Sequence, residues 1–143
     1  MKIAIGNDHT GVEMKQLLVS HIINKYGYEV INVGTDTAES VDYPVYGRKV
    51  AQLVADNKAN KGIVICGTGI GMSISANKVK GIRAALCKDQ EAAEMTRKHN
   101  DSNVLALGAR TTSLDEAIKI ADVWLTTEFE GGRHQRRVEM LEN

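Results

Sequence analysis

The sequence predicts an α/β fold, a single domain built as a doubly wound three-layer sandwich around a five-stranded parallel sheet. Short apolar segments alternate with segments of helical periodicity along the chain, which is the pattern of repeated βαβ units. The apolar run at 63–65 is β-branched throughout and suits a strand that is covered on both faces. A chain of 143 residues can bury the core of one domain without a disulfide or a metal.

The N-terminal half is expected to contain two strands and two helices. Lys2–Gly6 is apolar and ends in glycine, as a short strand does. The helix after it should bury one face, formed by Met14, Leu17, Leu18 and Ile22. Glu29–Val33 has the composition of a second strand, and the polar loop Gly34–Asp42 follows it. The only proline, Pro44, marks the start of a helix that should bury Val50, Leu53 and Val54.

The central segment Gly62–Gly71, with the sequence GIVICGTGIG, joins a buried strand to a glycine-rich loop. The strand ends in Cys66, and the loop contains Gly67, Gly69 and Gly71. Glycines let backbone N–H groups approach an anion closely at the N-terminus of the next helix. We therefore expect a reactive thiol and an anion cradle at one spot. The alternative is a tight turn beside a buried, inert thiol.

The C-terminal half is expected to contain two more strands, Ile82–Cys87 and Asn103–Leu107, after a short helix at Met72–Asn77. A helix that Asp89 caps should place on one face Ala92, Met95, Thr96 and His99. A capping box formed by Ser113 and Glu116 opens a helix that directs inward Ala117, Ala121 and Trp124. The last segment, 131–143, is polar and rich in arginine. We expect it to be a frayed surface helix or a C-terminal arm that docks on a neighbouring subunit.

The residues that follow the strands should meet, because the carboxyl ends of parallel strands lie at one edge of a sheet. Asp8 and His9 follow the first strand, Cys66 ends the third, and Arg110 follows the fifth. The predicted architecture is flavodoxin-like or Rossmann-like, and in such folds ligands bind outside the carboxyl ends of the strands. A candidate site is therefore expected at that edge.

Composition excludes several classes of function. Lys+Arg and Asp+Glu are equal at 18 each, so no global field attracts nucleic acid or an anionic membrane. Cys66 and Cys87 lie in separate apolar segments, and nothing resembles a signal peptide or a membrane span, so we expect a reducing, cytoplasmic setting. The glycine loop lacks the lysine of a Walker loop and the glycine spacing of a dinucleotide fingerprint, so no nucleotide cofactor is expected.

Six separated motifs, in order, resemble the ribose-5-phosphate isomerase B family, whose superfamily includes the galactose-6-phosphate isomerase subunits. They are GNDH at 6–9, DYP at 42–44, CGTGIG at 66–71, ANKVKGIRA at 76–84, HND at 99–101 and GGRHQRRVE at 131–139. The resemblance covers nearly the whole chain and implies the same five-stranded fold. The galactose-6-phosphate subunits divide these features between two chains. This chain keeps them together, which favours a homodimer or homotetramer.

The resemblance implies an aldose–ketose isomerase that interconverts ribose 5-phosphate and ribulose 5-phosphate through a cis-enediolate. Such a reaction needs a base, an oxyanion site, a ring-opening group and a phosphate clamp, and it needs no cofactor or metal. Cys66 corresponds to the base, and His99 to the ring-opening residue. The enediolate oxygen would be held by Thr68 and by the loop residues Gly67, Gly69, Ile70 and Gly71.

The remaining residues implied by the resemblance bind the substrate. Asp8 and His9 would contact the sugar hydroxyls, and Asp8 would also be a catalytic residue. Tyr43 and Asn100 would line the pocket. The phosphate clamp would consist of Arg110, Arg133 and Arg137, because guanidinium groups suit a dianion. The family places active sites between subunits. One subunit is thus expected to supply the Cys66 loop while its neighbour supplies some of His99, Asn100 and the arginines.

Each of these residues also has a plain structural alternative. Cys66 could be a packed core thiol, His99 could stabilise a helix dipole, and Asp8 could cap the first helix. Tyr43 could line the pocket or only pack beside Pro44. For the whole chain the alternatives are an isomerase of a six-carbon aldose 6-phosphate, such as allose or galactose 6-phosphate, and a non-catalytic flavodoxin-like binding module. A cysteine phosphatase would need an arginine within the cysteine loop, which 66–72 lacks.

Overall fold

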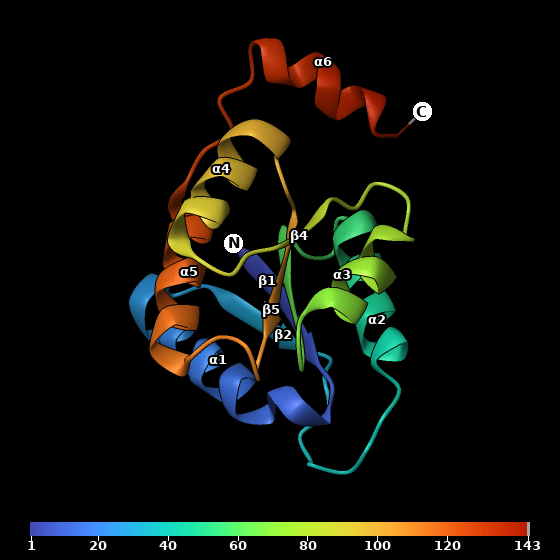
Figure 1. Cartoon of the computed structure of the whole chain (residues 1–143), viewed down its shortest axis with the longest axis vertical. Coiled ribbons are helices and arrows are strands. Elements are labelled where there is room, and N and C mark those ends of the chain that lie inside the picture. The colour runs from blue at the N-terminus through green and yellow to red at the C-terminus, as the bar shows by residue number, and fades with distance from the viewer. Residues whose placement is uncertain (143) are drawn as a thin grey trace.

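Five strands form one parallel sheet in the computed structural model, which describes residues 1–142 (Figure 1). The strands are β1 Lys2–Asn7, β2 Glu29–Asn32, β3 Lys61–Cys66, β4 Ala84–Leu86 and β5 Val104–Gly108. Their order across the sheet is β2-β1-β3-β5-β4, and every pairing is parallel. Asn143, the last residue of the expected arm, lies outside the described residues.

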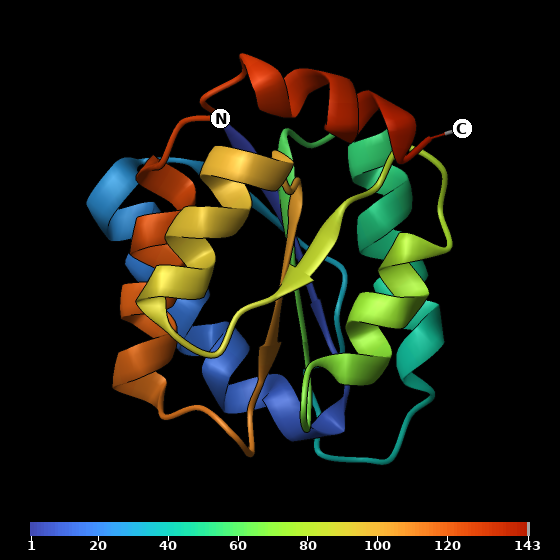
Figure 2. The same cartoon turned by 45° about the horizontal axis from the view of Figure 1, so that its top comes forward.

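Helices cover both faces of the sheet, which confirms the predicted three-layer α/β fold (Figures 1 and 2). One face packs against α1 (Val12–Tyr26), α4 (Gln90–Asn100) and α5 (Leu114–Thr126), and the other against α2 (Tyr43–Ala55) and α3 (Ile70–Asn77). Alternate strand residues serve the two faces: Ile63 and Ile65 belong to the first core and Val64 to the second. A 3₁₀ turn, η1 (His9–Gly11), follows β1, and α6 (Arg133–Met140) ends the fold.

The helix boundaries follow local signals that the sequence contains. Gly27 ends α1 in the left-handed conformation at φ 67°. The Asp89 carboxylate accepts a hydrogen bond from Ala92 N at 2.7 Å, and the Ser113 hydroxyl accepts one from Glu116 N at 3.2 Å. No helix among residues 1–142 is both long and apolar enough to cross a membrane.

Three details of the sequence prediction were wrong. Leu17 is exposed, because the buried stripe of α1 runs through Met14, Lys15, Leu18 and Ile22. On α4, Ala93 is the buried alanine, whereas Ala92 is only half-buried. The fourth strand is limited to Ala84–Leu86, since it is an edge strand that pairs with β5 alone over those three residues.

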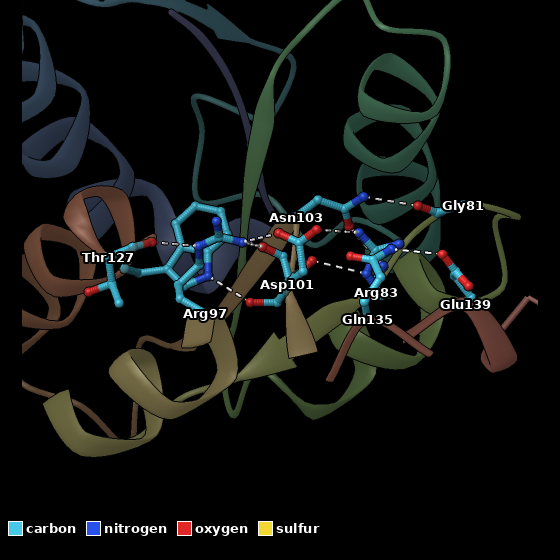
Figure 3. A network of polar contacts seen from close by, with 10 residues as sticks. Gly81, Arg83, Arg97, Asp101, Asn103, Thr127, Gln135 and Glu139 are labelled. Atoms are coloured by element: carbon cyan, nitrogen blue, oxygen red, sulfur yellow. Dashed lines mark hydrogen bonds and ion pairs between the residues drawn. The ribbon is translucent and has the colours of Figure 1, made fainter. Parts of the chain in front are cut away.

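A polar network joins the end of α4 to the start of β4 at the amino edge of the sheet (Figure 3). The buried Arg97 donates to Asp101 Oδ1 at 2.9 Å and to Ser102 O at 2.7 Å. Arg83 donates from Nε to Asp101 O at 2.9 Å, and its backbone N–H donates to Asn103 Oδ1 at 2.8 Å. Asp101 has φ 47°, a conformation that few residues other than glycine adopt. The network therefore fixes the turn that directly follows the end of α4.

Candidate active site

Segments that are far apart in sequence meet at the carboxyl edge of the sheet, as the strand ends predicted. The Asp8 N–H donates to Ile65 O at 3.0 Å, which places Asp8 beside Cys66. Arg110 donates its N–H to Gly67 O at 2.9 Å, and its Nη1 lies 3.6 Å from where a Cβ on Gly67 would be. Three of the predicted site segments, those that follow β1, β3 and β5, therefore form one cluster.

The Cys66 thiol ends β3 at the N-terminus of α3. It is 6 % exposed, and its Sγ accepts a hydrogen bond from Gly69 N at 3.2 Å. Gly69 adopts φ 78°, and a Cβ there would lie 2.5 Å from Leu86 Cδ1 and 2.9 Å from Leu107 C. Only glycine therefore allows the loop to direct this N–H at the sulfur. This backbone N–H, at a helix N-terminus, can stabilise negative charge on the sulfur.

Cys87 provides a contrast within the same sheet. Its side chain is fully buried, and its Sγ has a sulfur contact of 3.8 Å with Ala85 O. Burial, with a smaller contribution from Asp89, raises the pKa of the Cys87 thiol to about 12. Cys87 therefore stays protonated at neutral pH, as expected for a structural cysteine.

The rest of the cysteine loop forms an open rim above the thiol. Thr68 and Ile70 are exposed, and Thr68 Oγ1 accepts from Ile70 N at 3.3 Å. The first N–H groups of a helix have no acceptor within the helix, so those at the start of α3 can bind an oxyanion. Tyr43 packs on this helix start, because a Cβ on Gly71 would lie 2.6 Å from its ring. Tyr43 thus contacts the cysteine loop segment, in addition to preceding Pro44.

Asp8 and His9 each make a structural contact and keep an atom available. Asp8 Oδ1 caps η1, accepting from Thr10 N at 2.9 Å and from Thr10 Oγ1 at 2.6 Å. His9 Nδ1 accepts from Val41 N at 3.2 Å, so its other ring nitrogen is left to contact a ligand. Asp8 therefore caps the 3₁₀ turn that leads into α1, whose own N-cap is Gly11, and this role is compatible with substrate contact through Oδ2.

The structure does not bring His99, Asn100, Arg133 and Arg137 to this cluster. His99 and Asn100 end α4, just before β5 begins, whereas Cys66 is paired with Gly108 at the far end of β5. The length of β5 alone separates the two ends by roughly 13 Å. Helix α6, which contains both arginines, lies across the amino edge of the sheet, at the top of Figure 2.

A second polar cluster forms at the amino edge. The rings of His99 and His134 stack with centroids 4.5 Å apart, and Glu130 Oε1 lies 3.7 Å from Nε2 of each ring. Burial of the ring, together with the positive charges of His99, Arg133 and Arg137, lowers the pKa of His134. A cavity of about 240 Å³ beside the cluster is lined by His99, Asn100, His134, Arg137, Val138 and Leu141.

The charge around this second cluster indicates what it can bind. The donor atoms of His99, Glu130 and His134 lie within 4.8 Å of one another, so the trio could hold a transition metal ion. However, Arg133 and Arg137 place two fixed positive charges beside the rings. Guanidinium groups and imidazoles are suited to a phosphate dianion, so the arrangement favours an anion.

Sequence reasoning missed two buried polar residues near the carboxyl edge. Asn7 is fully buried and donates to Asp8 O at 2.8 Å and to Thr35 O at 3.0 Å. Lys15 is 1 % exposed and donates to Thr35 O at 2.7 Å. A signal for Lys15 was present, because it lies on the same helical face as Leu18 and Ile22, where only apolar residues were expected.

Comparisons with known proteins agree with this geometry. A family model described as Ribose/Galactose Isomerase matches residues 3–141. The chain is 49 % identical over 140 residues to ribose-5-phosphate isomerase B of Escherichia coli (strain K12), covering 98 % of this chain and 93 % of that protein. The structure of Clostridium thermocellum ribose-5-phosphate isomerase B has a TM-score of 0.95 at 54 % identity, covering 99 % of this chain and 95 % of that one. Ribose-5-phosphate isomerase B of Mycoplasma genitalium, solved with bound ribulose-5-phosphate, has a TM-score of 0.95 at 40 % identity, covering 99 % and 93 %. The chain therefore belongs to the ribose/galactose isomerase family.

Proposed function

We propose that this chain is an aldose–ketose isomerase that interconverts ribose 5-phosphate and ribulose 5-phosphate. The observation that carries the proposal is the Cys66 thiol, which accepts a hydrogen bond from Gly69 N at 3.2 Å beside Asp8 and Arg110. The relative solved with bound ribulose-5-phosphate supports a five-carbon substrate.

The chemistry follows from these positions. The Cys66 thiolate removes the proton from C2 of the open-chain aldose, and the electron pair of that bond forms the C1–C2 double bond. Negative charge then develops on O1, where Thr68 and the N–H groups at the start of α3 stabilise it. A proton moves from O2 to O1, and the Cys66 thiol returns a proton to C1. The product is the ketose, and the thiolate is regenerated.

A second copy of the chain completes the site in this proposal. His99, Asn100, Arg133 and Arg137 lie at the opposite edge of the sheet, too far from Cys66 of their own chain to act with it. Exposed apolar side chains flank the Cys66 loop, with Ile70 50 % and Ile74 55 % exposed. Such a patch suits an interface. The arm 131–143 would dock there, so that its arginines and Arg110 clamp one phosphate while His99 opens the furanose ring.

The assembly is then a homodimer or homotetramer, with both copies needed at each site. We also place the protein in the cytoplasm. Both cysteines are free, and a thiol that acts as a base must stay reduced.

An assay of the purified protein against three substrates tests the function. Ribose 5-phosphate, allose 6-phosphate and galactose 6-phosphate are each supplied, and ketose formation is followed by a coupled enzyme. We expect the highest kcat/KM with ribose 5-phosphate. A higher value with either hexose phosphate would contradict the five-carbon assignment, and no turnover of any of the three would contradict isomerisation.

A further inference from the structure

The loop that follows β2 connects the buried Lys15 to His9 at the candidate site. We infer that Lys15 is a positioning residue, which holds this loop so that Val41 fixes His9 with Nδ1 as acceptor and Nε2–H directed at the ligand. The inference deepens the proposed function and rests on it for its catalytic meaning. Its structural content, the tautomer of His9, does not depend on which substrate is bound.

The Lys15 ammonium group contacts the loop that follows β2. A buried ammonium is tolerated only when acceptors surround it. Lys15 Nζ donates to Thr35 O at 2.7 Å, forms an ion pair with the Asp36 carboxylate, and lies 3.5 Å from Asn32 Oδ1. The hydrogen bonds from Lys15 and then Asn32 lower the pKa of Asp36. All the contacts of this ammonium therefore go to one short segment, 32–36.

The same segment, 32–36, is also held from β1. Asn7 Nδ2 donates to Thr35 O at 3.0 Å, so this carbonyl oxygen receives hydrogen bonds from two buried side chains. The loop also lies directly against β1, because a Cβ on Gly34 would lie 1.9 Å from Asn7 Oδ1. Beyond this anchor the side chains of residues 36–40 are exposed. The anchor at Thr35 therefore sets where the rest of the loop lies.

The other end of the loop contacts His9. The Val41 N–H donates to His9 Nδ1 at 3.2 Å. A ring nitrogen that accepts a hydrogen bond has no proton, so neutral His9 has its proton on Nε2. His9 follows Asp8 directly at the carboxyl edge. It thus presents an N–H donor that suits a sugar hydroxyl or phosphate oxygen.

The tautomer can be measured directly in the unmodified protein. The chain contains four histidines, which are labelled with ¹⁵N and distinguished by comparison with a His9→Gln variant. At neutral pH we expect two-bond correlation spectra to show His9 with a protonated Nε2 and an unprotonated Nδ1. A proton on Nδ1 of His9 would overturn the inference. This result does not depend on activity, so the inference and the proposed function can fail separately.

Two variants test the link from Lys15 to His9. Lys15→Met keeps the length of the side chain and removes the ammonium group. We expect kcat/KM for ribose 5-phosphate to fall about tenfold or more, chiefly through KM, and His9 to lose its single tautomer. The rate of Cys66 alkylation should not change, because the Cys66 loop is held by β5. If this variant does not fold, Val41→Pro removes the donor to His9 outside the core and should give the same loss of tautomer.

Lys25→Met is the matched control. Lys25 lies on the same helix, and its ammonium contacts Asp122 on α5 at 3.1 Å, away from the loop. We expect this variant to keep kcat/KM within about twofold of wild type and to keep the His9 tautomer. Wild-type kcat/KM and an unchanged His9 tautomer in Lys15→Met would overturn the role of Lys15. An equal loss in Lys25→Met would do so as well, because it would indicate a general effect of charge on α1.

Discussion

Cys66 and Cys87 are both buried, but only the Cys66 sulfur accepts a hydrogen bond from a backbone N–H at a helix N-terminus. Cys66→Ser should fold normally and lose roughly a thousandfold or more in kcat. The reason is that a serine hydroxyl at neutral pH is a far poorer base than a thiolate. Steady-state kinetics measure the loss, and circular dichroism checks the fold.

Cys87→Ala is the matched control for that prediction. Cys87 is fully buried, and burial raises its pKa to about 12. Its replacement should lower stability by about 1 kcal/mol while kcat stays close to wild type. Near-full activity in Cys66→Ser would refute Cys66 as the base.

His99 is assigned to ring opening, and this role predicts an unequal effect on two steps. In His99→Asn, turnover of cyclic ribose 5-phosphate should fall. Exchange of the C1 or C2 proton with solvent, starting from the open-chain substrate, should fall much less, because that step needs only Cys66 and the oxyanion donors. Proton exchange is followed by NMR in D₂O. Exchange that falls as far as overall turnover would place His99 in the isomerisation step itself.

Individual residues differ in how far the sequence predicts their position. Cys66, Asp8 and Arg110 could be placed together because Cys66 ends a strand and the other two follow strands, and the carboxyl ends of parallel strands share an edge. Lys15 could not be assigned a partner, because the carbonyl that it binds, Thr35 O, belongs to an irregular loop without periodicity. The acceptor of a buried lysine is set by tertiary structure.

Among the helices, α1 and α5 are joined by a cluster around Asp122. His21 Nε2, Tyr26 OH and Lys25 Nζ lie 2.8, 2.6 and 3.1 Å from its carboxylate oxygens. Burial opposes ionisation of this group, but the three hydrogen bonds outweigh burial and lower the pKa of Asp122. The sequence suggested no such role for His21, because its partner is distant along the chain.

This cluster predicts a pH-dependent contribution to stability. The pKa of Asp122 is lower in the folded state than in the unfolded state, where it is about 3.9. The stabilisation is therefore complete above that pH and is lost as the pH falls through the folded value. Asp122→Asn should lower the unfolding free energy by about 1 kcal/mol at pH 7.

Urea unfolding of wild type and Asp122→Asn between pH 7 and pH 2.5 measures this difference. The difference should stay constant down to roughly pH 4 and shrink below it. A difference that shrinks between pH 7 and pH 5 would indicate that another group is responsible.

The sequence predicts where the strands lie along the chain more reliably than it predicts their order across the sheet. Strands such as Lys61–Cys66 are buried on both faces, and a continuous apolar run in the sequence indicates such a strand without reference to the rest of the chain. The position of β5 between β3 and β4 depends on which helices pack together, and no local pattern specifies it. Edge strands are also hard to delimit, since the mostly apolar segment 82–87 extends beyond the three paired residues of β4.

At the scale of the whole molecule, the two groups of proposed site residues lie at opposite edges of the sheet. Cys66→Ser and Arg137→Ala chains should each be inactive alone. When they are mixed with subunit exchange, a mixed dimer has one intact site and one doubly damaged site. About half of the dimers are mixed, so activity should return to about a quarter of wild type. The measurement is turnover, with exchange verified by mass spectrometry of differently labelled chains.

No recovery despite verified exchange would mean that Cys66 and Arg137 of one chain serve the same site. Mixing Cys66→Ser with Asp8→Ala is the matched control. Both residues belong to the carboxyl-edge cluster of one chain, so each site of a mixed dimer lacks one of the two. No site in a mixed dimer is intact, so activity should remain absent.

The strand order also has a consequence for synthesis on the ribosome. β4 pairs only with β5, and β5 lies between β4 and β3. When β4 leaves the ribosome it has no partner, and the edge of β3 stays open until residues 104–108 have been made. At 5 to 20 residues per second this delay is on the order of one to a few seconds. A strand of only three residues offers little edge for wrong pairing during that delay.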